Sequence, residues 1–298
     1  MDKESYDSFV KAGHIAAEAL AFGQKKVKIG ASLREVCDAV EQKIKALGGE
    51  IAFPAQTSLN HVAAHNCPPP EDDTVYKEGD VVKLDIGAHI NGYVADNACT
   101  INLGAYDDLV KASRDAVNAA IRILEPGLPV CKIGKVIEEA ITSYGFEPIR
   151  NLCGHGLGKY RVHTSPTIPN YDNGDPTPLK EGQAIAIEPF ASTGSGMIHE
   201  SGQATVFMQI NKKPIRSPIA RNIQKEIEAY QGLPFTTRWL TQKFSLGNVK
   251  LALLELKKIG NIREYPPLPE KNGGMVSQAE HSIIIKDKPV VITKRDED

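Results

Sequence analysis

The sequence predicts an α+β fold in which two similar halves surround a shared sheet. Two helical patterns followed by strand patterns occur twice along the 298 residues. The segment at 27–49 also resembles the segment at 129–146 in layout, which indicates a weak internal duplication. A third observation is a helical and partly proline-rich segment at 214–269, which interrupts the second half and which we interpret as an insertion.

The first half begins with two predicted helices. Apolar and small residues recur at helical spacing from about 5 to 22. The second helix begins at Ser32, because Glu35 three residues later completes a capping box, and it ends at Gly48 and Gly49.

A β-hairpin is predicted next. The stretch at 80–90 is rich in β-branched residues and leads into Asn91-Gly92, a two-residue turn signal, after which YVADNACTINL returns. Two further helices are expected at about 106–124 and 132–144. Further strands are expected at 184–190, 204–210, 281–285 and 290–293.

Composition narrows the class of protein. Lys+Arg is 35 and Asp+Glu is 37, so the net charge of −2 gives no reason to expect nucleic acid or an anionic membrane as the main partner. The five cysteines contain no CxxC pair, which favours free thiols over a disulfide framework or a structural zinc site. The N-terminus resembles no signal peptide and no stretch is long enough to span a bilayer, so we expect a cytoplasmic protein.

The hairpin brings two carboxylates to one face. With a two-residue turn, paired residue numbers sum to 183, so position 87 faces Asp96. Asp85 lies two residues from 87 and shares its face, which places the two Cα atoms roughly 7–8 Å apart. Such carboxylates repel unless a cation lies between them, and dinuclear hydrolytic sites hold their ions roughly 3.5–4 Å apart. A solvated sheet edge is the alternative, and for an aspartate pair alone it is the commoner case.

Three further residues favour a metal site. Glu188 ends the apolar stretch AIAIE, and Glu280 precedes the apolar stretch HSIII, where a charge without a partner would be costly to bury. His155 stands between two glycines in CGHGLG, so its ring can approach a ligand closely. Four carboxylates and one imidazole suit divalent Mn, Fe, Co or Zn.

These segments resemble a known family. KLDIGAHINGYVAD, NLCGHGLGKYRVH, AIEPF and QAEHS are similar to the successive metal-binding segments of the methionine aminopeptidases, whose pita-bread fold has pseudo-twofold halves around a mostly antiparallel sheet. AFPAQTSLNHVAAH and the gap of 92 residues from 188 to 280 (280 − 188) resemble the type II branch, and the short leader resembles its archaeal members. The resemblance implies a catalytic domain at 1–213 and 270–298 and an inserted helical, winged-helix-like subdomain at 214–269.

The resemblance also implies roles for the five ligand-type residues. Asp85 would bind one divalent ion, His155 and Glu188 would bind the other, and Asp96 and Glu280 would bridge both. A water or hydroxide between the ions would be the nucleophile. Glu188 would also carry protons during the reaction.

Four further residues match the family's substrate-binding positions. His65 and His163 match histidines that contact the substrate, and such a donor would stabilise the oxyanion. Phe53 and Val162 match apolar positions that line the methionine pocket. Cys153 is expected to be a small core residue rather than a nucleophile. The remaining histidines are expected to be structural: His14, His61, His89, His199 and His281.

The implied function is removal of the initiator methionine from nascent polypeptides whose second residue is small. The protein would act as a monomer on nascent N-termini, with the ribosome as a candidate partner of the insert. HTSPTIPN resembles proline-cleaving relatives, so a proline-directed aminopeptidase or dipeptidase is one alternative. A non-catalytic pita-bread protein that binds peptides, RNA or other proteins is the other.

Overall fold

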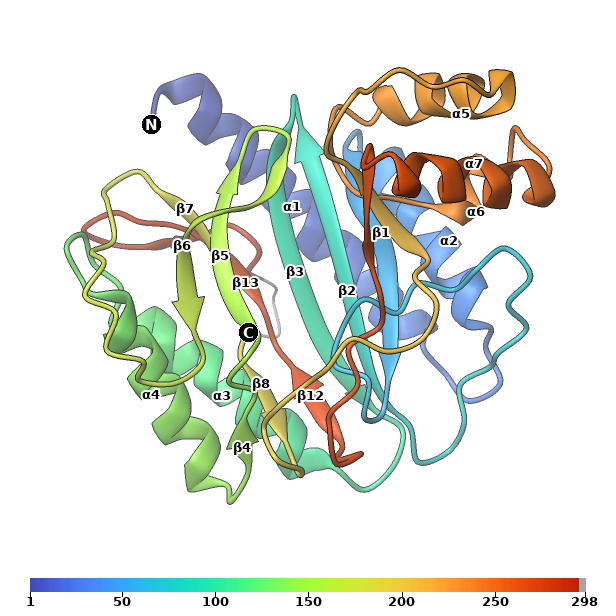
Figure 1. Cartoon of the computed structure of the whole chain (residues 1–298). Helices are drawn as coiled ribbons and strands as arrows, with labels where there is room; N and C mark the ends of the chain where they lie inside the picture. Colours follow the sequence, from blue (N-terminus) through green and yellow to red (C-terminus); the bar gives the residue numbers. More distant parts are fainter. Residues whose placement is uncertain (295–298) are drawn as a thin grey trace.

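Three long antiparallel strands and two helices form the first half of the molecule. The computed structural model describes residues 1–294, and Figure 1 shows the two helices behind this sheet. The sheet has the order β1-β2-β3, and helix α1 packs on β2 and β3 while α2 packs on β1. These elements are α1 (Lys3–Lys26), α2 (Leu33–Ala46), β1 (Glu50–Leu59), β2 (Val81–Ile90) and β3 (Tyr93–Asn102). The predicted start of α2 is confirmed, since Ser32 is its N-cap and the Ser32 hydroxyl accepts a hydrogen bond from the Glu35 amide, which is one of the two bonds of a capping box.

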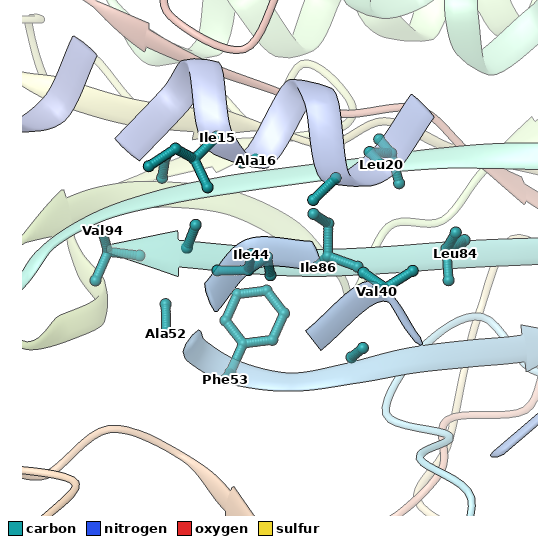
Figure 2. Packing of buried hydrophobic residues seen from close by; sticks show 14 of the residues in the cluster. Ile15, Ala16, Leu20, Val40, Ile44, Ala52, Phe53, Leu84, Ile86 and Val94 are labelled. Atoms are coloured by element: carbon teal, nitrogen blue, oxygen red, sulfur yellow. The ribbon is translucent and has the colours of Figure 1, made fainter. Parts of the chain in front are cut away.

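Apolar side chains join these helices to one face of the sheet. In Figure 2, Ile15 and Leu20 on α1 and Ile44 on α2 gather around Ile86 of β2. All four belong to one buried core cluster. Each such side chain contributes about 1.5–3 kcal/mol when it is fully buried. Because side chains alternate along a strand, Asp85 points to the opposite face from Ile86.

The predicted hairpin register is confirmed. Ile90 pairs with Tyr93 and Gly87 pairs with Asp96, so each pair sums to 183. Asn91 and Gly92 both have positive φ, of 52° and 87°, as a two-residue type I′ turn requires. The turn therefore fixes which residues of β2 and β3 share a face.

The second half repeats the arrangement of two helices against strands. Helices α3 and α4 pack over a second core cluster, and the strands form the sheets β14-β13-β7-β5-β6 and β12-β8-β4. The helices are α3 (Asp107–Arg122) and α4 (Val130–Ser143). The strands are β4 (Glu147–Pro148), β5 (Cys153–Gly158), β6 (Arg161–Pro169), β7 (Ala184–Ile187), β8 (Phe190–Ser192), β12 (Val276–Gln278), β13 (His281–Ile284) and β14 (Val290–Val291). Every strand pairing within residues 1–294 is antiparallel, in agreement with the predicted fold class.

The two halves meet where β3 lies against β5 and β13, although no continuous ladder joins them. Hydrogen bonds of the Ser282 hydroxyl on β13 connect the two halves instead. It accepts from the Asp96 amide at 2.8 Å and donates to the Asp96 carbonyl at 2.7 Å. The Glu280 amide also donates to the Ala98 carbonyl at 3.0 Å. These bonds fix the start of β13 against β3.

The inserted segment has its own core and its own small sheet, of order β10-β9-β11. Its elements are β9 (Val206–Gln209), α5 (Pro218–Glu228), β10 (Phe235–Thr236), α6 (Thr237–Leu240), α7 (Leu246–Lys258) and β11 (Ile262–Tyr265). Strand β9 was predicted as a strand, but its partners are both in the insert, so this packing unit extends before position 214. The functional division of the chain at 214–269 stays a prediction.

Two composition-based expectations can also be compared with the structure. None of the five cysteines, all of which lie within residues 1–294, forms a disulfide, in agreement with the prediction. Among residues 1–294, none of the helices combines the length and the apolar character needed to cross a bilayer.

Candidate active site

The five predicted ligand residues come from different strands of the two halves. Asp85 lies on β2, Asp96 on β3 and His155 on β5, whereas Glu188 follows β7 and Glu280 precedes β13. The structure brings Asp96, His155 and Glu280 together, with one ligand atom of each within 4.8 Å of the others. His155 Nε2 lies 3.7 Å from Asp96 Oδ2 and 3.5 Å from Glu188 Oε1.

Backbone pairing explains why these residues meet. The hairpin places Asp85 and Asp96 on the face of the sheet away from the helices. His155 on β5 pairs with Ala186 on β7, two residues before Glu188. The Ser282 bridge to Asp96 then holds the start of β13, and with it the preceding Glu280, against the hairpin.

Burial makes the cluster electrostatically unfavourable without a cation. Desolvation raises the pKa of Asp85 to about 7, and it raises the pKa values of Asp96, Glu188 and Glu280 well above their usual range, with repulsion between the carboxylates as a further cause. Within residues 1–294, one oxygen each of Asp85 and Asp96 and both oxygens of Glu280 are buried without a hydrogen-bond donor. Such atoms need a cation or a proton.

The histidine of the cluster is arranged as a neutral ligand. Burial lowers the pKa of His155 to about 3. Its Nδ1 lies 3.2 Å from the Gly156 carbonyl, which can only accept, so we assign the proton to Nδ1. The lone pair on Nε2 then faces the carboxylates. A neutral imidazole with acceptor-only oxygens around it fits a divalent first-row ion, so the donor set suits the implied metals.

A cavity of about 250 Å³ opens beside this cluster. Four of the five candidate ligands line it, while Glu280 is 2% exposed and contributes no surface to the wall. All four residues predicted to contact substrate also line it: Phe53, His65, Val162 and His163. The remaining wall residues are Gln56, Ala64, Asn151, Leu152, Cys153, Phe190, Val206, Pro234 and Tyr265.

Both histidines predicted to contact the substrate, His65 and His163, lie in the cavity wall. The His163 ring lies 4.3 Å from the His155 ring, centroid to centroid. Burial and the charge of His163 lower the pKa of His65 to about 4, against the smaller opposite effect of a hydrogen bond to the Pro266 backbone, so the ring is neutral at physiological pH and carries one N–H. The His65 ring also packs edge-on against Tyr265 at 5.5 Å.

One residue lies elsewhere than predicted, and several wall residues were not predicted at all. Cys153 is exposed and lines the cavity, because it lies two residues before His155 and shares its face of β5. The surrounding cavity wall still removes much of the solvent around its sulfur, and this desolvation, with the nearby charge of Glu188, raises the pKa of Cys153 to about 11, so it remains a thiol. Pro234 and Tyr265 come from the insert, and no local pattern marks them. Only the proline-rich composition of 266–269 hints at a constrained segment there.

Comparison with known proteins identifies the family. The model of metallopeptidase family M24 matches residues 7–214. The chain belongs to metallopeptidase family M24. The family predicted from the sequence motifs is thereby confirmed.

Relatives within the M24 family match over the whole length. The chain is 44% identical to a methionine aminopeptidase of Archaeoglobus fulgidus, over 99% of this chain and all of that protein. It is also 44% identical to a methionine aminopeptidase of Thermococcus onnurineus, over 96% and 98% of the two chains.

Solved structures confirm the pita-bread fold of this M24 protein. A thermophilic Arx1 superimposes with a TM-score of 0.87 at 18% identity, covering 98% of this chain and 91% of that one. A methionine aminopeptidase of Thermotoga maritima superimposes with a TM-score of 0.73 at 24% identity, covering 99% and 98%.

Proposed function

We propose that this M24 protein is a methionine aminopeptidase that removes the initiator methionine from nascent polypeptides. The observation that carries the proposal is the cavity of about 250 Å³, because four of the five candidate ligands line it beside an apolar wall. Phe53, Val162 and Phe190 contribute to that wall, which suits an unbranched thioether side chain. The relatives at 44% identity over nearly the whole chain support the same activity.

Two divalent ions would be held by Asp85, Asp96, His155, Glu188 and Glu280. The unsatisfied carboxylate oxygens and the neutral imidazole support this assignment. When bound, the two ions would lower the pKa of a coordinated water towards neutrality. The donor set accepts Co, Mn, Fe or Zn, and metal analysis of protein purified from its natural source would identify the ions.

Protein side chains would supply the remaining chemistry. Glu188 lines the cavity, and its Oε1 lies 3.5 Å from His155 Nε2, so its carboxylate is placed to take a proton from the attacking water and deliver it to the leaving amine. His65, neutral and at the cavity wall, would donate to the carbonyl oxygen as negative charge develops on it. His163 would contact the substrate from the neighbouring side.

The test is turnover of short peptides by the metal-loaded protein. We expect release of methionine from Met-Ala-Ser, with slower release when the second residue is bulky. Release of the first residue from Xaa-Pro peptides in preference to Met-Ala-Ser would favour a proline-directed peptidase. Binding of these peptides without cleavage, at saturating Mn²⁺, would favour the non-catalytic alternative.

The cellular setting follows from the substrate. We infer that the protein acts in the cytoplasm, as a monomer, near the ribosome from which nascent chains emerge. Helix α7 of the insert exposes Leu251 and Leu254 beside several lysines, which makes it a candidate contact. Replacing both leucines by glutamate should abolish co-sedimentation with ribosomes and leave peptide cleavage intact. Unchanged co-sedimentation would remove this surface from consideration.

A further inference from the structure

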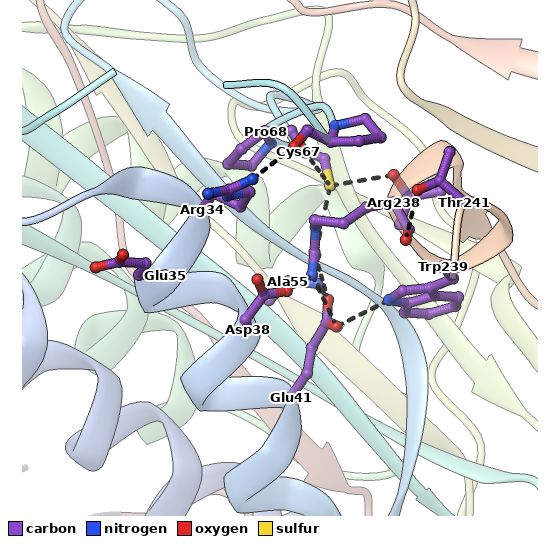
Figure 3. A network of polar contacts seen from close by, with 12 residues as sticks. Arg34, Glu35, Asp38, Glu41, Ala55, Cys67, Pro68, Arg238, Trp239 and Thr241 are labelled. Atoms are coloured by element: carbon purple, nitrogen blue, oxygen red, sulfur yellow. Dashed lines mark hydrogen bonds and ion pairs between the residues drawn. The ribbon is translucent and has the colours of Figure 1, made fainter. Parts of the chain in front are cut away.

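A buried arginine of the insert, Arg238, bonds to helix α2 of the first half, as Figure 3 shows. Arg238 on α6 is 5% exposed. Its guanidinium donates to both carboxylate oxygens of Glu41 on α2, at 2.5 and 3.1 Å, and also to Asp38 one turn earlier. The neighbouring Trp239 donates its indole N–H to Glu41 at 2.8 Å. Charges buried this deeply persist only when they are paired, so Arg238 and Glu41 depend on each other.

Glu41 also holds an irregular part of β1. The β1 residues Phe53 and Gln56 are three positions apart, whereas their partners on β2 are two apart, so β1 contains a bulge between them. The amide of Ala55 lies in this bulge and donates to Glu41 Oε1 at 3.1 Å. The same carboxylate therefore binds the insert and satisfies the bulge.

The bulge leads directly into the cavity wall. Phe53 and Gln56, on either side of Ala55, both line the cavity. Gln56 Oε1 accepts a hydrogen bond from the amide of His65 at 2.8 Å. His65 has a φ of 65°, which is uncommon for a residue other than glycine and needs support from its surroundings.

The segment after His65 is bonded to Arg238 of the insert and to Thr205, which directly precedes β9. Thr205 donates to the carbonyl of Cys67 at 2.6 Å, and Arg238 Nη2 lies 3.9 Å from the Cys67 sulfur. His65 is thus held on one side by Gln56 and on the other through Cys67. Both supports lead back to the contact between the insert and the first half of the chain.

We propose that Glu41 and Arg238 are a positioning pair for catalysis, which fixes the β1 bulge and through Gln56 the substrate-facing His65. This inference rests on the proposed aminopeptidase function. Neither side chain lines the active-site cavity, and none of the five candidate metal ligands lies on β1, α2 or α6. The pair should therefore affect turnover without affecting metal binding.

The first experiment separates turnover from metal binding. Glu41→Gln retains an acceptor for Ala55 but loses the charge, and Arg238→Met loses the donors. We expect kcat/KM on Met-Ala-Ser to fall about ten- to a hundredfold in each, mainly through kcat, as for other small displacements of a catalytic group. Calorimetric titration with Mn²⁺ should give the wild-type stoichiometry and affinity.

The second experiment tests whether a small cation restores the turnover that is lost with the arginine side chain. A second cavity, of about 620 Å³, is lined by Asp38, Glu41 and Trp239, so a small cation can reach the space that Arg238 vacates. Added guanidinium should restore turnover to Arg238→Ala, whereas urea at the same concentration should not. The matched control is Lys243→Met, which breaks the 2.7 Å pair with Glu226 inside the insert and should show neither the loss nor the rescue.

The outcomes distinguish the two proposals. Wild-type kcat and KM in Glu41→Gln and Arg238→Met would overturn the positioning role and leave the proposed function intact. Lost Mn²⁺ binding in Glu41→Gln, or equal rescue by urea, would mean a general structural role and would also overturn it. A wild-type protein that binds Mn²⁺ but never releases methionine would overturn the proposed function itself.

Discussion

Replacing Asp85 by asparagine should change how the stability of the metal-free protein depends on pH. Burial raises the pKa of Asp85 from 3.8 to about 7, so the folded protein keeps a proton that the unfolded chain has already released. A carboxyl with a raised folded pKa stabilises the fold at low pH, and this contribution is lost as the pH rises through about 7. The asparagine variant has no such dependence at this position.

The size of the effect follows from the two pKa values. Between pH 5 and pH 6 the wild type loses about 1.4 kcal/mol of unfolding free energy per pH unit through this carboxyl; the slope falls to about half of that at pH 7, and the loss levels off above it. Relative to wild type, Asp85→Asn should therefore gain about 2.5 kcal/mol between pH 5 and pH 8. The substitution also removes the charge of Asp85 that raises the pKa of Asp96, and this change likewise stabilises the variant relative to the wild type at higher pH.

Urea unfolding of chelator-treated protein at the two pH values provides the assay. Trp239 is the single tryptophan of the chain, so its emission follows unfolding directly. Saturating Mn²⁺ at pH 8 is the control, because it should stabilise wild type more than a variant that lacks a proposed ligand. A difference in stability between the two proteins that is equal at pH 5 and pH 8 would refute the reasoning.

Three further predictions concern the active site. The variants Asp96→Asn and Glu280→Gln should each contain less metal by elemental analysis than the wild type, and kcat should fall by more than about a hundredfold. Full turnover with full metal content would contradict the ligand assignment. A Cβ added at Gly87 would lie 2.2 Å from the Phe53 ring, so Gly87→Ala should displace that ring and raise KM for Met-Ala-Ser several-fold. An unchanged KM would contradict the assignment of Phe53 to the methionine pocket. His65→Ala should lower kcat about 10²–10³-fold with little change in KM, and the reverse pattern in steady-state kinetics would assign His65 to substrate binding alone.

The parts of the fold that sequence predicts best are those set by local rules. The Asn91-Gly92 turn has two residues, so it fixes the register of the whole hairpin, and alternation then places Asp85 and Asp96 on one face. The N-cap at Ser32 likewise marks the start of α2. Both predictions depend on neighbouring residues only, and the structure confirms both.

Contacts between distant segments could not be predicted in this way. Arg238 and Glu41 are 197 positions apart, and neither stands in a periodic pattern that identifies the other as its partner. Strand β9 was assigned to the catalytic part because a short apolar strand carries no information about which strands will pair with it. For the same reason the insert residues of the cavity wall, such as Tyr265, became visible only in the structure.

Anomalous diffraction from crystals grown with Mn²⁺ tests the central claim most directly, because manganese can be located without reference to the protein chain. The account predicts two peaks roughly 3.5–4 Å apart, enclosed by Asp85, Asp96, His155, Glu188 and Glu280. Peaks outside this cluster, or an empty cluster at saturating Mn²⁺ and neutral pH, would contradict it.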